Sequence, residues 1–308
     1  MQIGGQRRSN NFEDRGAGRG GSGGGGGGVP IQALVSLVSL LGFKGTLLAG
    51  AVLAMGFCVM PAGLRQELLG ALTGGGEGAL STPGAGSVCD ASQANGAACD
   101  FSRVVLASTE DVWTQQFERG ALPNYGSAPG AYRHPTLVVF ANSVSTGGCG
   151  GATSDVGPFY CPGDQKLYID PSFYSVMERR LRAPGDFAQA YVIAHEVGHH
   201  VQNLIGSTRL QTRGETSNQN SVRVELQADC LAGVWGHTAR ASLQITDDDL
   251  GEALTAAHAI GDDTLGHSDE RKFTHGSSEQ RKRWFRRGFD SGDARRCDTF
   301  AVQRYQEL

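Results

Sequence analysis

The longest apolar stretch of this chain covers residues 31–60, where Lys44 is the only charged side chain. A helix of about 20 apolar residues can cross a lipid bilayer, so the stretch predicts one transmembrane helix. Arginines precede it, whereas the first charges after it, Arg65 and Glu67, cancel. This asymmetry predicts a cytoplasmic amino terminus and an extracytoplasmic position for the rest of the chain. A lysine at mid-bilayer costs roughly 2.5–3.5 kcal/mol, and a cleaved signal peptide is the alternative interpretation.

Polar, glycine-rich segments flank this stretch. Residues 1–30 combine arginines with a run of glycines at 23–28, which predicts a flexible basic tail on the cytoplasmic side. Residues 61–100 are rich in Gly, Ala and Ser over much of their length, which predicts a linker. The remaining residues, 101–308, are numerous enough to bury a substantial core. We therefore expect one folded domain after a membrane anchor.

Beyond residue 100 the apolar positions recur at strand and helix spacings. The β-branched and aromatic run 136–142 and the shorter run 166–170 predict strands, with a glycine-rich loop at 145–162 between them. Amphipathic stretches predict helices at residues 104–119, 187–204, 221–242, 247–262 and 278–289. Thr246 is a good N-cap, and Ser277 with Gln280 matches a capping box. The predicted fold class is α+β, with a small sheet packed on a helical body.

The predicted helix 187–204 contains His195-Glu196-Val197-Gly198-His199, an H-E-x-x-H motif. Residues four apart share one face of a helix, so His195 and His199 present two imidazoles to one point. Imidazole nitrogens bind Zn²⁺ at roughly 2.0–2.1 Å. Glu196 is too constrained to be a third ligand, but it is placed to take a proton from a metal-bound water. The alternative is two partly exposed histidines on an amphipathic helix.

A second pair of candidate residues lies on the predicted helix 221–242. Glu225 and Asp229 are four apart and share one face, on a helix that continues with Leu231, Val234 and Trp235. Two unpaired carboxylates on such a buried helix would be expensive. A metal-binding histidine usually donates its other N–H to a carboxylate, which fixes the ring. We therefore predict Glu225 as the third zinc ligand and Asp229 as the residue that orients a histidine.

These residues resemble known metallopeptidases. The spacing of Glu225 and Asp229 after H-E-x-x-H resembles the gluzincins. A longer resemblance, to a bacterial family of membrane-anchored neutral zinc metallopeptidases, covers most of the chain after about residue 100. It rests on residues 110–113, 157–162, 195–200, 225–235 and 273–281. It implies a zincin-like fold with zinc on His195, His199 and Glu225 and with Glu196 as the base. It implies no particular substrate.

Three further polar residues come from the same segments. Gluzincins and the resembling family place a basic or hydrogen-bonding group from this later region over the zinc, which makes His275 a candidate oxyanion stabiliser; the alternative is that it packs its loop. Arg281 is a candidate partner for an active-site carboxylate. His200 adjoins His199 but lies about 100° around the helix, so it is assigned a surface or orienting role and not ligation.

The number and spacing of the cysteines agree with an extracytoplasmic position of the domain. Six follow the predicted membrane span, and their even number predicts disulfide bonds formed in an oxidising compartment. Their spacing favours pairing within the two short intervals and leaves the last two for each other, which gives Cys89–Cys99, Cys149–Cys161 and Cys230–Cys297. Cysteine ligation of zinc is disfavoured because the C-x-x-C spacing of structural zinc sites is absent.

The overall charge of the chain bears on its possible partners. The chain has 27 Lys and Arg residues against 31 Asp and Glu, so nothing suggests a nucleic-acid partner. We predict a membrane-anchored, extracytoplasmic zinc endopeptidase that hydrolyses protein or peptide substrates through a metal-activated water. One alternative is a zinc-stabilised, non-catalytic domain that binds envelope proteins, although a structural site has no use for Glu196. Another is amidase or esterase chemistry at the same zinc.

Overall fold

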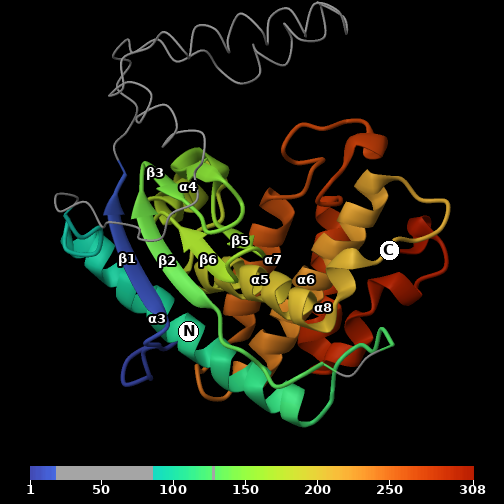
Figure 1. The fold of residues 1–308 in the computed structure, drawn as a ribbon, viewed down its shortest axis with the longest axis horizontal. Helices are drawn as coiled ribbons and strands as arrows, with labels where there is room; N and C mark the ends of the chain where they lie inside the picture. The colour runs from blue at the N-terminus through green and yellow to red at the C-terminus, as the bar shows by residue number, and fades with distance from the viewer. Residues whose placement is uncertain (19–85, 127–128) are drawn as a thin grey trace, which may run out of the picture. The chain divides into compact units, whose positions relative to one another are not determined.

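The computed structural model describes residues 1–18, 86–126 and 129–308. A four-stranded mixed sheet lies beside a body of helices (Figure 1), which confirms the predicted α+β class. The sheet order is β1 (Phe12–Ala17), β2 (Thr136–Ala141), β6 (Lys166–Ile169) and β5 (Phe159–Cys161). The first three strands run parallel, and β5 is antiparallel to β6.

The helices supply most of the core. They are α3 (Gln93–Glu118), α4 (Phe173–Arg179), α5 (Asp186–Ile205), α6 (Ser217–Ala239), α7 (Asp247–Ala259) and α8 (Ser278–Ser291). Thr246 is the N-cap of α7 and Ser277 with Gln280 closes a capping box at the start of α8, both as predicted; the structure adds a capping box between Thr246 and Asp249. These start signals are local, so their position follows from sequence alone. Helix α3 begins eleven residues earlier than the predicted residue 104, because Ser92 caps it through Asn95.

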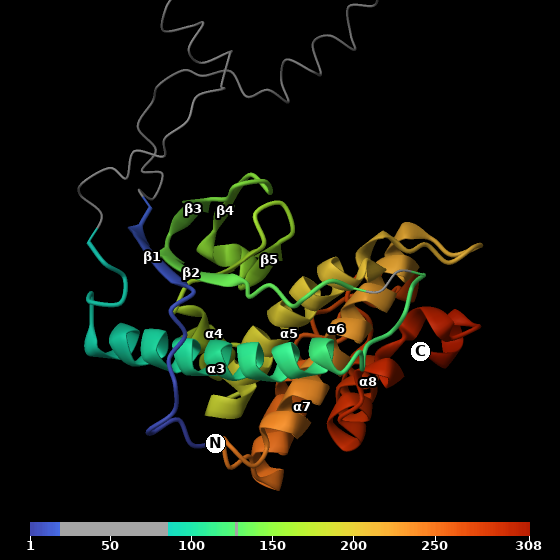
Figure 2. The same cartoon turned by 60° about the horizontal axis from the view of Figure 1, so that its bottom comes forward.

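The two faces of the sheet bury alternate residues of its strands. Leu137 and Val139 of β2 belong to the main core with α3 and α5, whereas Val138 and Phe140 belong to a smaller cluster on the other face. A hairpin formed by β3 (Ser143–Ser145) and β4 (Gly151–Thr153) contributes to this smaller cluster. Figure 2 shows α3 and α5 on one side of the sheet and the hairpin on the other. The sheet is therefore covered on both sides.

The amino-terminal residues are part of this fold, so the prediction of a flexible tail is wrong for residues 1–18. Strand β1 pairs with β2 from Phe12 onward. Glu110 of α3, which is 1% exposed, accepts hydrogen bonds from side chains of the segment before β1. The amino group of Met1 lies 3.1 Å from Asp186 and 2.8 Å from Asp249. The strand is not predictable from local sequence, because β1 is polar and its partner strand β2 is distant along the chain.

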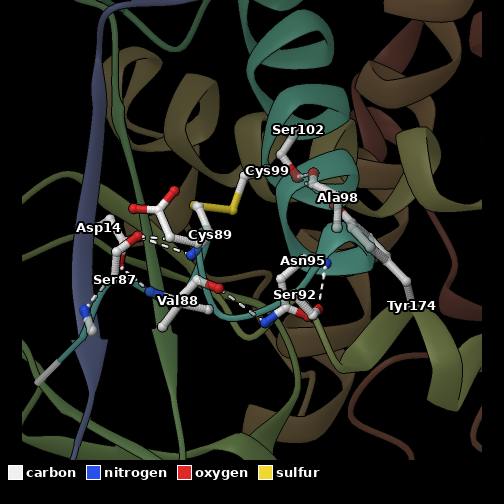
Figure 3. The surroundings of a disulfide bond; sticks show 12 residues. Asp14, Ser87, Val88, Cys89, Ser92, Asn95, Ala98, Cys99, Ser102 and Tyr174 are labelled. Atoms are coloured by element: carbon white, nitrogen blue, oxygen red, sulfur yellow. Dashed lines mark hydrogen bonds between the residues drawn. A yellow bond between two sulfur atoms is a disulfide. The ribbon is translucent and has the colours of Figure 1, made fainter.

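The predicted linker also joins the fold before residue 100. Asp14 accepts hydrogen bonds from the Ser87 hydroxyl and from the backbone N–H groups of Val88 and Cys89 (Figure 3). The disulfide Cys89–Cys99 then ties this segment to α3. The folded domain therefore begins before residue 101 and includes β1.

The predicted transmembrane span, residues 31–60, lies outside the described residues. Within the described ranges, no helix combines the length and apolar character needed to cross a bilayer. The predicted topology placed the amino terminus and the domain on opposite sides of a membrane. That part is wrong for residues 1–18, because strand pairing between β1 and β2 requires both to lie in one compartment.

The three predicted disulfides are confirmed. They join Cys89 with Cys99, Cys149 with Cys161 and Cys230 with Cys297. The second one ties the loop after β3 to the end of β5, and the third ties α6 to the carboxy-terminal segment.

Candidate metal centre

Helices α5 and α6 meet closely at the H-E-x-x-H motif. A Cβ on Gly198 would lie 3.0 Å from the carbonyl oxygen of Ala228, so a glycine at this position lets the two backbones approach. The approach brings His195 and His199 of α5 against Glu225 of α6, whose ligand-type atoms all lie within 4.8 Å of one another. The three predicted ligand residues therefore come together, each partly or fully buried.

The ring nitrogens of the two histidines face different partners. The Nε2 atom of His195 lies 3.2 Å from Glu225 Oε2, and that of His199 lies 3.5 Å from Glu225 Oε1. The Nδ1 atoms point away from this cluster to hydrogen-bond partners. Two Nε2 atoms and one carboxylate thus converge on one small volume. Zinc prefers ligands of these kinds.

Asp229, the residue predicted to orient a histidine, lies against His195. Its Oδ1 atom lies 2.8 Å from His195 Nδ1, so the ring donates there and keeps Nε2 for the convergent cluster. Burial acts to lower the pKa of His195, but the Asp229 carboxylate and the hydrogen bonds outweigh it and raise the pKa to about 10. Arg281, the predicted carboxylate partner, pairs with Asp229 at 2.9 Å.

Gln202 orients His199, a role the sequence reasoning missed. His199 Nδ1 donates to Gln202 Oε1 at 2.8 Å. The Gln202 amide nitrogen in turn donates to the Val224 carbonyl at 2.7 Å and to Gln227 Oε1 at 3.0 Å, which fixes the orientation of the amide. The available signal was a glutamine three residues after the second histidine, on the same helix face.

The two glutamates of the site have opposite electrostatics. Burial would raise the pKa of Glu225, but the adjacent histidines and Arg281 outweigh it and hold that pKa well below its usual range. Burial raises the pKa of Glu196, and the two histidines and a hydrogen bond from the Tyr160 backbone only partly oppose this. The Glu225 carboxylate is therefore ionised and suited to bind a metal ion, whereas the Glu196 carboxylate has the greater affinity for a proton.

The two other candidate histidines lie outside the convergent cluster. His200 is fully buried and bonds to Tyr160 and to the Arg133 carbonyl, so an orienting role fits it and a surface role does not. The His275 side chain is half exposed, and its Nδ1 lies 3.3 Å from Asp262. Among the described residues, no hydrogen bond or ion pair joins His275 to the three convergent residues. Its oxyanion role stays a prediction.

Comparison with known proteins agrees with this geometry. A family model described as "Putative neutral zinc metallopeptidase" matches residues 1–300. The "Uncharacterized protein YpfJ" of Escherichia coli strain K12 is 50% identical over 214 residues, which cover 66% of this chain and 71% of that protein. The "Uncharacterized protein Rv2575" of Mycobacterium tuberculosis strain H37Rv is 44% identical over 188 residues, which cover 56% of this chain and 64% of that protein. No solved structure matches significantly.

Proposed function

Because the chain belongs to the family described as "Putative neutral zinc metallopeptidase", we propose that it is a zinc-dependent endopeptidase. The observation that carries the proposal is the convergence of His195, His199 and Glu225, with both histidines held by their Nδ1 atoms. A bound zinc ion would be held by these three residues. It would lower the pKa of a coordinated water to about 7 and polarise a carbonyl group.

Glu196 supplies the general base. It follows His195 directly and lies outside the group of convergent ligand atoms. Its carboxyl group, with a pKa raised by burial, accepts a proton from the attacking water and passes it to the leaving amine. This use of a glutamate separates the proposal from a purely structural zinc site, in which no base is needed.

Strand β5 is the proposed platform for a peptide substrate. In the described part of the chain, β5 is the edge of the sheet and its outer side carries no paired strand. Tyr160 of β5 contacts the metal helix through its hydroxyl, which lies 3.0 Å from His200 Nδ1 and accepts from Asn203 at 3.1 Å, and its backbone acts to lower the pKa of Glu196. An extended peptide that adds to this edge would use main-chain hydrogen bonds for affinity. Its scissile bond would then lie near Glu196.

The test compares Glu196→Gln with wild type on a peptide library. The full chain should be used, because β1 belongs to the folded domain. We expect Glu196→Gln to keep its zinc and its fold while hydrolysis falls by about 10²–10⁴-fold. Glu178→Gln, an exposed residue of α4, is the matched control and should cleave like wild type.

Three results would contradict the proposal. Wild-type protein that contains zinc but cleaves no peptide would instead favour the zinc-stabilised domain that binds envelope proteins. Cleavage that survives both a chelator and Glu196→Gln would place the chemistry at another site. Hydrolysis of esters or simple amides in place of peptides would instead favour amidase or esterase chemistry at the same zinc.

We also propose that the domain acts outside the cytoplasm at a membrane, on protein or peptide substrates. Three disulfides support an oxidising compartment, and the apolar residues 31–60 support membrane attachment. In a Cys58→Ser background, single cysteines at exposed Asn10 and Arg119 should both react with a membrane-impermeant maleimide in spheroplasts. Protection of both would contradict the extracytoplasmic location. Protection of residue 10 alone would contradict the shared compartment.

A further inference from the structure

Asp229 stands at the centre of a buried hydrogen-bond network behind the metal centre. Its Oδ1 atom accepts from His195 Nδ1 at 2.8 Å and from the Tyr191 hydroxyl at 2.6 Å. Arg281 donates to both carboxylate oxygens, from Nη2 to Oδ1 at 2.9 Å and from Nε to Oδ2 at 2.9 Å. Asp229 is fully buried and Arg281 is 2% exposed. The pair is therefore bidentate and shielded from water.

Helix α8 brings Arg281 to this position from far along the chain. Its close crossing with α6 depends on two glycines, because a Cβ on Gly233 would overlap the Phe285 backbone and one on Gly288 would overlap the Cys230 backbone. The third nitrogen of the guanidinium, Nη1, donates to the Ile260 carbonyl at 3.2 Å. Arg281 is thus held from two sides, and it can hold Asp229 in a single orientation.

The network distinguishes the two carboxylates that α6 presents near the metal centre. Glu225 and Asp229 lie four residues apart on one helix face, and either carboxylate is chemically able to bind a metal. Only Glu225 belongs to the convergent group. The bidentate contact with Arg281 occupies both oxygens of Asp229 and supplies a compensating charge, which a buried carboxylate needs.

We propose that Arg281 is a positioning residue for the metal centre: it fixes Asp229 as the acceptor for His195 Nδ1–H and thereby aims His195 Nε2 at the ion. The inference rests on the proposed zinc site. Tyr191 contributes one further hydrogen bond, to Oδ1 of Asp229. It does not replace the guanidinium, because in the described part of the chain it is Arg281 that donates to Oδ2.

The test measures zinc affinity of the full chain by competition with a chelator. Loss of a group that orients a metal ligand typically weakens binding by about 10–100-fold, and we expect this for Arg281→Gln. Arg281→Lys keeps the positive charge but lacks the planar guanidinium, so its zinc affinity should lie between that of wild type and that of Arg281→Gln. Arg286→Gln, a half-exposed position on the same helix with one long ion pair of 3.9 Å, is the matched control and should bind like wild type.

A spectroscopic measurement separates positioning from general destabilisation. In zinc-loaded wild type, the Nδ1–H proton of His195 should be visible by NMR as a slowly exchanging, hydrogen-bonded signal. It should shift or disappear in Arg281→Gln and persist in Arg286→Gln. If Arg281→Gln does not fold, Arg281→Lys and Tyr191→Phe take its place, with the larger change expected for Arg281→Lys.

The outcomes distinguish the two claims. Wild-type protein that binds no zinc would overturn the proposed function itself. Tight zinc binding by wild type with an unchanged affinity and an unchanged His195 signal in the Arg281 variants would overturn only the positioning role.

Discussion

The hydroxyl of Tyr160 lies 3.0 Å from Nδ1 of His200, which joins the edge strand β5 to the metal helix α5. His200 Nε2 donates to the Arg133 carbonyl at 2.6 Å. Burial lowers the pKa of His200 to about 4, so the ring is neutral near pH 7 and has one N–H, which it uses on Arg133. Its Nδ1 therefore accepts the proton of Tyr160, whose oxygen accepts from Asn203 at 3.1 Å.

We predict that Tyr160→Phe loosens β5 on the metal helix. The change leaves a buried His200 nitrogen and the Asn203 amide without their partner, which costs about 1–3 kcal/mol. If β5 is the substrate platform, KM for peptides should also rise more than kcat falls. Urea unfolding and steady-state kinetics measure the two effects. Unchanged stability and unchanged KM would show that this hydrogen bond does not hold the strand.

A second prediction concerns the orientation of His199. Gln202→Met removes the acceptor of His199 Nδ1–H, so zinc affinity should fall by about 10–100-fold. Gln202→Glu keeps an acceptor but sets an oxygen against the Val224 carbonyl and the Gln227 amide oxygen. It should therefore retain more affinity but lose about 1–3 kcal/mol of stability. Gln189→Met on the same helix is the control, and equal zinc affinity in all three variants would refute the assignment.

A third prediction tests the attachment of the amino-terminal segment. Glu110 accepts hydrogen bonds from Arg7 at 2.8 Å, from Ser9 at 2.5 Å and from Asn11 at 2.7 Å. Glu110→Gln removes the charge and turns one acceptor into a donor that faces these groups, so the free energy of unfolding should fall by about 1–3 kcal/mol. Asp111→Asn, an exposed neighbour that also contacts Arg7, should change it by less than about 0.5 kcal/mol. Equal effects in urea unfolding would mean that the segment is not anchored through Glu110.

The local parts of the fold and site could be predicted from sequence. The N-cap Thr246, the capping box at Ser277, the short-range cysteine pairs and two pairs of residues at i,i+4 spacing all depend on neighbours along the chain. Their positions in the structure agree with the prediction for that reason.

The parts of the fold and site that depend on contacts between distant residues could not be predicted from the sequence. Strand β1 reads Phe-Glu-Asp-Arg-Gly-Ala, which lacks an apolar alternation, and it is stabilised through β2 and through Glu110 of α3. The acceptor role of Gln202 depends on Gln227 of another helix. The sequence makes Arg281 a candidate partner for an active-site carboxylate, but its bidentate contact with Asp229 needs the crossing of α6 and α8, which no local pattern specifies.

The zinc content of the purified full chain tests the central claim most directly. Elemental analysis by mass spectrometry should find about one zinc ion per chain, because His195, His199 and Glu225 converge and supply the nitrogen and carboxylate ligands that zinc prefers. His195→Ala, His199→Ala and Glu225→Ala should each lose most of it, and Asp229→Ala should bind about 10–100-fold more weakly. His258→Ala, at an exposed position of α7, should retain it fully. Full zinc retention in Glu225→Ala, or a wild-type chain that binds no zinc, would contradict the account.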